Sequence, residues 1–242
     1  VDKYVRMSPG DFVGIGGRPS TGKTAFSLQV MMNIARQHKT VYFSLETSTD
    51  KLFERMVSCY ASFDYDTITK GKIDYETLTK LNNDCHDGFS KMNFSVVNAA
   101  GWTVEQIRSK ALQMKAEVIF VDYLGLIRSK DGKSIYEKVT QISLDLHTVA
   151  QQDKVLIVTL IQLNRGGAGQ PDMTSLRDSG QIEQDLDVLM LLHTPDESDA
   201  QRAYKKLTIA KNKDGKQGIV EFEFKGNIQR FFAQYNGDKP FD

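Results

Sequence analysis

The sequence is poor in the residues that disulfide-bonded and zinc-dependent proteins use. Its 242 residues include only Cys59 and Cys85, and these do not form a C-x-x-C motif. This usage argues against a disulfide framework and against a cysteine-based zinc site. The 4 histidines are scattered along the chain without the spacing of metal ligands. We therefore expect neither a disulfide-stapled nor a zinc-stabilised protein.

Long apolar runs and an excess of charge of one sign are also missing. No stretch approaches the ~20 apolar residues that span a bilayer, and no cationic start followed by an apolar segment indicates a secretory signal. The 31 basic and 31 acidic residues cancel, which argues against a broad basic face for nucleic acid but allows a narrow basic path. We expect a cytoplasmic protein without a membrane partner. The chain opens on Val1, as an excised fragment would.

What the sequence does contain is a complete phosphate-binding motif, G-x-x-x-x-G-K-[ST]. Its glycines let the backbone curl so that N–H groups point at phosphates. Lys23 adds a positive charge near the outer phosphates, and the Thr24 hydroxyl is suited to ligate Mg²⁺. A predicted strand at 12–15 and a helix at 25–32 put the phosphates at a helix N-terminus, where the dipole favours anions. The motif consists of Gly17, Arg18, Pro19, Ser20, Thr21, Gly22, Lys23 and Thr24.

Short apolar runs alternate with helical segments along the chain. The runs at 118–121 and 155–160 are apolar throughout, which is typical of strands in a parallel sheet covered by helices on both faces. With no repeat or interdomain linker visible, we predict one α/β domain over residues 1–242. Further strands are predicted at 40–44, 94–97, 188–192, 207–210 and, as an alternating edge strand, 219–224. Helices are predicted at 51–61, 75–89, 104–115 and 136–152, and loops at 126–134 and 163–175.

Polar residues follow three of the predicted strands, where ligands bind in an open parallel sheet. Asp122 ends the strand 118–121, a pattern typical of the second magnesium motif of P-loop proteins. Glu46 follows the strand 40–44 and is a candidate to polarise an attacking water. Gln162 is a candidate sensor of the terminal phosphate. The alternatives are turn or cap roles for the two carboxylates and a solvated surface amide for Gln162.

Five motifs in order resemble those of DnaB-type replicative helicases. The phosphate loop carries Arg-Pro-Ser in the same places, and SLE at 44–46, VDYLGLI at 121–127 and IQLNR at 161–165 resemble three further motifs. The most specific is SLRDSGQIEQDLD at 175–187, which we associate with no other ATPases. The resemblance covers the chain from about Gly10 to Phe224.

The resemblance implies a RecA-like P-loop fold with a mostly parallel central sheet and helices on both faces. It implies a ring homo-hexamer with ATP and Mg²⁺ at subunit interfaces, and 5′-to-3′ travel along single-stranded DNA. It makes Glu46 the catalytic base and places Arg177, Asp178 and Gly180 on a loop that grips the DNA backbone. Arg165 is a further candidate on the DNA path.

Two features depart from the family pattern. Family members carry an N-terminal helical collar that recruits primase, whereas here nothing precedes the motor. We therefore expect the motor alone, with primase and a helicase loader contacted through regions outside this chain. At Lys213 the family has an arginine finger that reaches the neighbouring nucleotide. Lysine supplies the charge but not the planar fork of donors, so either Lys211 or Lys213 serves here, or the finger lies elsewhere, with Arg202 as a candidate.

Two other interpretations share the phosphate loop. One is a RecA-fold module that binds DNA in a nucleotide-dependent way, for recombination or regulation, without unwinding it. The other is a small-molecule kinase, which needs an acceptor pocket and a lid that the sequence does not reveal. The motif at 175–187 favours the helicase over the RecA-fold binding module.

Overall fold

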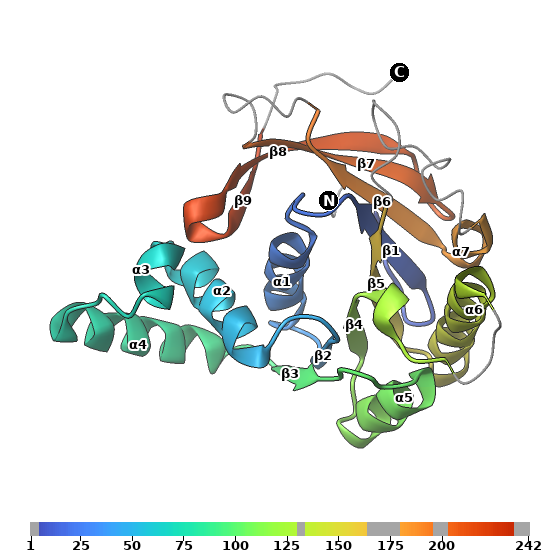
Figure 1. Ribbon diagram of the computed structural model, residues 1–242, viewed down its shortest axis with the longest axis horizontal. Helices are drawn as coiled ribbons and strands as arrows, with labels where there is room; N and C mark the ends of the chain where they lie inside the picture. The colour runs from blue at the N-terminus through green and yellow to red at the C-terminus, as the bar shows by residue number, and fades with distance from the viewer. Residues whose placement is uncertain (1–4, 130–133, 164–179, 196–202, 235–242) are drawn as a thin grey trace.

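The computed structural model describes residues 5–129, 134–163, 180–195 and 203–234 (Figure 1). Nine strands of this described part form one sheet, in the order β3-β2-β4-β5-β1-β6-β7-β8-β9. The strands from β3 to β6 run parallel to one another, and β7, β8 and β9 are antiparallel to their neighbours. The predicted α/β fold with a mostly parallel sheet is therefore confirmed.

The strand bounds follow the apolar runs of the sequence closely. The parallel strands are β1 Phe12–Gly17, β2 Thr40–Ser44, β3 Phe94–Asn98, β4 Val118–Asp122, β5 Leu156–Gln162 and β6 Val188–His193. The antiparallel strands are β7 Tyr204–Asn212, β8 Gly218–Lys225 and β9 Arg230–Ala233. The prediction of an edge strand at 219–224 is wrong, because β8 pairs with β7 on one side and with β9 on the other.

Helices cover both faces of the sheet. They are α1 Lys23–Ile34, α2 Thr49–Ala61, α3 Tyr65–Thr69, α4 Tyr75–Phe89, α5 Val104–Gln113, α6 Ile135–Asp153 and α7 Gly180–Asp185, with 3₁₀ turns η1 Leu124–Leu126 and η3 Gly226–Ile228. Helices α3 and α4 form the end of the molecule farthest from α6 (Figure 1). Capping boxes begin α5 and α6. The side-chain oxygens of Thr103 and Ser134 accept from the backbone N–H of the third helical residue, and the side chain of that residue accepts from the backbone N–H of the capping residue.

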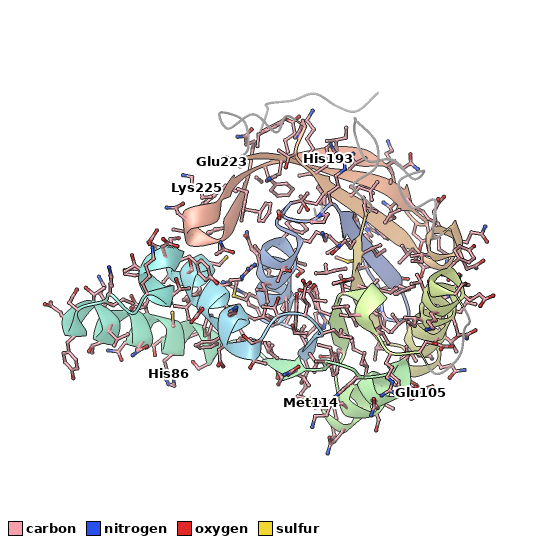
Figure 2. All side chains as sticks on the ribbon, in the orientation of Figure 1. His86, Glu105, Met114, His193, Glu223 and Lys225 are labelled. Carbon is pink, nitrogen blue, oxygen red and sulfur yellow. The ribbon has the colours of Figure 1, made fainter. Side chains whose placement is uncertain are left out.

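Two apolar cores lie on opposite faces of the sheet, since successive residues of a strand point to opposite sides. Val41 and Val121 belong to the core beneath α5, α6 and α7. Tyr42 and Phe120 belong to the core beneath α1 and α2. Side chains from the sheet and the helices fill the space between these layers (Figure 2). None of the described helices has the length and apolar character needed to cross a membrane.

The short strand β9 closes over the helix that follows the phosphate loop. The side-chain amide of Gln29 on α1 donates to the carbonyl oxygen of Phe231 at 2.9 Å and accepts from its backbone N–H at 2.8 Å. The Phe231 ring packs edge-on against Phe26, with 5.2 Å between the ring centroids. These contacts join segments about 200 residues apart in sequence and hold the end of the sheet against the first helix.

Candidate nucleotide-binding site

The phosphate-binding motif lies in the loop between β1 and α1, and its glycines are required by geometry. Gly22 has φ +96°, in the left-handed region, and a Cβ there would lie 3.1 Å from the Phe231 ring. A Cβ at Gly17 would lie 2.7 Å from the carbonyl oxygen of Leu192. The Thr21 hydroxyl donates to the carbonyl oxygen of Arg18 at 2.9 Å, which closes the loop on itself. Both glycines are thus fixed by close approach of the rest of the fold.

The ammonium of Lys23 lies within this loop. Its Nζ donates to the carbonyl oxygens of Gly17 and Arg18, each at 2.8 Å. Burial lowers the pKa of Lys23 to about 8, although the charges of Asp122 and Glu46 act to raise it. A cation held in a partly desolvated loop at a helix N-terminus is suited to bind a phosphate.

The hydroxyl of Thr24 and the carboxylate of Asp122 meet next to that lysine. Thr24 Oγ1 donates to Asp122 Oδ2 at 2.9 Å, and Asp122 is only 3% exposed at the end of β4. Burial raises the pKa of Asp122, while hydrogen bonds from Tyr42 and Thr24 and the charge of Lys23 partly offset that rise. The pair joins the first turn of α1 to the end of β4.

These oxygens fit a magnesium ion that is shared with a nucleotide. Mg²⁺ prefers hard oxygen ligands and is usually held by one or two carboxylates together with substrate phosphates. A P-loop hydroxyl and a strand-end carboxylate are the usual protein contribution. No group of three or more His, Cys, Asp or Glu side chains suited to a metal occurs among the described residues. The remaining ligands would therefore come from phosphates and water.

Glu46 and Gln162 lie at the same edge of the sheet as the loop. Glu46 is exposed just beyond β2. Burial dominates the pKa shifts of Lys23 and Asp122, but the charge of Glu46 also acts on both, which places it near them. Gln162 ends β5 with an exposed side chain, and its Cα pairs with that of Gly17. The parallel register thus brings Gln162 to the phosphate loop, whereas Glu46 follows β2, the neighbour of β4, and the catalytic roles of both residues remain predictions.

Lys211 and Lys213 lie at the opposite side of the sheet, level with the amino ends of the parallel strands. Lys213 Nζ donates to Asp187 Oδ1 at 2.8 Å, and Asp187 Oδ2 accepts from the backbone N–H of Phe12 at 3.0 Å. Phe12 begins β1, whereas the phosphate loop follows its other end at Gly17, which at ~3.3 Å per residue is roughly 16 Å away. Neither lysine is thus placed to reach the loop of its own chain.

Lys211 is tied to the end of a helix. Its Nζ donates to the carbonyl oxygens of Glu183 and Gln184 at 2.7 and 3.0 Å, near the C-terminus of α7. Any role of Lys211 or Lys213 in phosphate chemistry would therefore be directed at a neighbouring subunit.

Most of the predicted DNA-contacting residues lie outside the described part of the chain. These are Arg165, Arg177 and Asp178, together with the alternative finger Arg202. Gly180 is described as the first residue of α7.

Two residues near the site had no signal in any motif. The hydroxyl of Tyr42 donates to Asp122 Oδ2 at 2.9 Å, and Ser27 Oγ lies 2.9 Å from the same hydroxyl. Strand alternation could have placed Tyr42 on the face of the sheet that α1 covers, but not its distance to Asp122.

Comparison with known proteins gives one consistent family. Residues 2–233 match the family model of the DnaB-like helicase C terminal domain. The chain is 32% identical over 232 positions to the replicative DNA helicase DnaB of Treponema pallidum (strain Nichols), covering 93% of this chain and 52% of that protein. It is 31% identical over 258 positions to the replicative DNA helicase DnaC of Bacillus subtilis (strain 168), covering 98% and 56%. The chain thus spans about half the length of these relatives.

Two solved structures share the fold. One, an ATPase domain, matches with a TM-score of 0.85 at 29% identity, covering 93% of this chain and 84% of that one. The other, a DnaB-like replicative helicase described with its interactions with primase, matches with a TM-score of 0.84 at 29% identity, covering 93% and 57%.

Nucleotide binding is expected to take up a proton in alkaline buffer. Because burial holds the pKa of Lys23 at about 8, the lysine is largely neutral at about pH 9, and a bound polyphosphate would raise its pKa and recharge it. Calorimetry of ADP binding in buffers of different ionisation enthalpy should give an uptake approaching one proton at about pH 9 and close to none at about pH 7. Equal uptake at both would contradict a lowered Lys23 pKa. Lys23→Arg, which stays charged, is the control.

Proposed function

This chain belongs to the family of DnaB-like helicase C-terminal domains, and from that membership we propose that it is an ATP-hydrolysing motor that moves 5′ to 3′ along single-stranded DNA as a ring of six copies. The observation that carries the proposal is the meeting of Thr24 and Asp122 at 2.9 Å beside the Lys23 ammonium. This arrangement supports a site for ATP with Mg²⁺ at the carboxyl edge of the sheet.

In the proposed mechanism the phosphate loop binds and orients the triphosphate. Lys23 exchanges its two carbonyl partners for phosphate oxygens, and the N-terminus of α1 adds its dipole. Thr24 and Asp122 would hold Mg²⁺, which neutralises charge on the phosphates when bound. Each of these groups lies on a strand end or a helix start, so the sheet fixes their separation.

Glu46 is proposed to orient and deprotonate the attacking water. A general base must lie within hydrogen-bond reach of that water, and an exposed carboxylate beyond β2, beside Lys23 and Asp122, suits that position. Gln162 is proposed to follow the terminal phosphate, since its strand is paired with the start of the loop at Gly17. Gln162 directly precedes the segment with Arg165, so loss of the phosphate would be passed toward the proposed DNA path.

The active site is proposed to be shared between neighbouring copies. Each chain carries its phosphate loop at one edge of the sheet and Lys211 and Lys213 at the other, as a head-to-tail ring requires. Lys213 is 58% exposed on its side chain although it pairs with Asp187. It is therefore available to a neighbouring nucleotide at the cost of its pair with Asp187, a carboxylate that is only 8% exposed and that keeps its hydrogen bond from the backbone N–H of Phe12.

The partners follow from the same proposal. Single-stranded DNA would contact Arg165, Arg177, Asp178 and Gly180, and the motor would act in the cytoplasm. Primase and a helicase loader would bind through parts of the protein outside this chain. One structural relative is described with its interactions with primase.

Unwinding of forked DNA tests the proposal as a whole. The protein should hydrolyse ATP faster with single-stranded DNA and should unwind a fork that has a free 5′ tail on the strand it tracks. A fork that offers only a 3′ tail should stay paired. Nucleotide-dependent DNA binding without unwinding of either fork would instead support a regulatory or recombination module.

Replacing Glu46 separates binding from chemistry. Glu46→Gln should lower ATP turnover by about 10²-fold or more, because the amide cannot accept the proton of the attacking water. ATP affinity should stay near that of the wild type. Steady-state ATPase and fluorescent nucleotide titration measure the two quantities, and Glu76→Gln, an exposed change on α4, is the matched control. Normal turnover in Glu46→Gln would leave the carboxylate only a structural role.

Mixing two inactive variants tests the shared site. Lys213→Ala should lower turnover by ~10³-fold, the effect of a charge supplied by a neighbour in related sites. Lys213→Arg should keep or raise the wild-type turnover. Lys23→Ala spoils its own loop but keeps Lys213, so rings that mix Lys23→Ala with Lys213→Ala should regain activity at mixed interfaces. Rings that mix Lys23→Ala with Glu46→Gln should not regain activity. Lys23 and Glu46 both belong to the phosphate-loop side of a site, so every site in such a ring carries one of the two changes. Absence of recovery in the first mixture would exclude Lys213 as the finger.

A further inference from the structure

We propose that Tyr42 is a positioning residue for the magnesium carboxylate Asp122, and that it ties this carboxylate to the phosphate-loop helix through Ser27. The inference rests on the proposed function, since it requires Asp122 to serve a metal–nucleotide complex. It adds a residue from the middle of β2 that belongs to none of the motifs above.

The Tyr42 hydroxyl and the Thr24 hydroxyl converge on one carboxylate oxygen. Both donate to Asp122 Oδ2, each at 2.9 Å, from two different elements, β2 and α1. Two donors from different directions fix the plane of the carboxylate. Oδ1 is then the oxygen that these donors do not engage, and it is held in a set orientation for a metal-bound water. Such outer partners orient metal ligands and strongly affect metal affinity.

The position of the Tyr42 hydroxyl is set by the sheet. Tyr42 is fully buried, and its ring stacks on Phe120, the residue opposite it on β4, with centroids 5.8 Å apart and planes 12° apart. The side chain therefore reaches along the sheet face from a point two residues before the end of β2.

Ser27 links this tyrosine to the helix that carries the loop. Ser27 Oγ lies 2.9 Å from the Tyr42 hydroxyl and 2.9 Å from the carbonyl oxygen of Thr24. The contacts close into a ring that runs from Asp122 through Tyr42, Ser27 and Thr24 back to Asp122. Because Tyr42 gives its proton to the carboxylate, the one proton of Ser27 serves either Tyr42 or the Thr24 carbonyl. The helix α1 is thus connected to the carboxylate directly through Thr24 and, when Ser27 donates to Tyr42, also through that tyrosine.

A hydroxyl that only satisfies the core would affect stability and nothing else. A hydroxyl that positions Asp122 would affect how much Mg²⁺ tightens nucleotide binding. This coupling is the ratio of two dissociation constants for a fluorescent ADP analogue, measured in excess EDTA and in excess Mg²⁺. The ratio is independent of turnover and of DNA.

Tyr42→Phe is the test variant, because it keeps the ring and its stacking on Phe120 and removes only the hydroxyl. It should reduce the Mg²⁺ enhancement of ADP binding by about 10-fold, the low end for loss of an outer partner of a metal site. Its affinity in EDTA should stay within about twofold of wild type. Ser27→Ala, which removes the more distant contact, should give a smaller loss, on the order of threefold. Tyr60→Phe removes the hydroxyl of a half-buried tyrosine that packs on Gly88 of α4, and it should change neither quantity.

Three results would overturn the inference. An unchanged Mg²⁺ enhancement in Tyr42→Phe would show that the hydroxyl does not position Asp122. An equal loss of affinity with and without Mg²⁺, accompanied by a lower melting temperature, would assign it to packing of α1. If Tyr42→Phe fails to fold, an unchanged enhancement in folded Ser27→Ala would refute the link. A wild-type protein whose ADP binding ignores Mg²⁺ would instead remove the proposed function itself, and the inference with it.

Discussion

The site depends on the burial of one carboxylate. Asp122 is 3% exposed at the end of β4, and a charged group in that position is tolerated only with close partners. Thr24 and Tyr42 supply hydrogen bonds, and the nearby Lys23 supplies opposite charge. Loss of one partner from such a buried group typically costs ~1–3 kcal/mol. The need to satisfy this oxygen therefore draws the first turn of α1, the middle of β2 and the end of β4 into one arrangement.

Much of this arrangement could be predicted from the sequence, because it follows from two regular features. Apolar runs set the parallel strands, and the carboxyl ends of parallel strands meet at one edge. The strand at 40–44 and the helix at 75–89 have the predicted bounds. The same logic placed Asp122, Glu46 and Gln162 beside the phosphate loop without any knowledge of the contacts.

The remainder required tertiary structure. The strand β9 has four residues, and it is held in place by the packing of Phe231 on α1, which no local pattern reveals. The helices α3 and α7 have 5 and 6 residues, too short for a helical period to stand out. Tyr42 reads in sequence as one more aromatic residue of a buried strand. Its hydroxyl is distinguished only by the positions of Asp122 on the neighbouring strand and Ser27 on the covering helix.

The contacts between α1 and β9 also have a consequence for how the protein is made. Gly22 lies against the ring of Phe231, and Gln29 bonds to its backbone groups, yet both residues come about 200 residues earlier in the chain. Synthesis runs from the N-terminus, so the phosphate loop and its helix leave the ribosome long before the strand that covers them. During that interval the surface of α1 around Phe26 has no partner from β9. A nascent chain of this protein therefore carries its nucleotide loop in an unfinished form until β9 has been made.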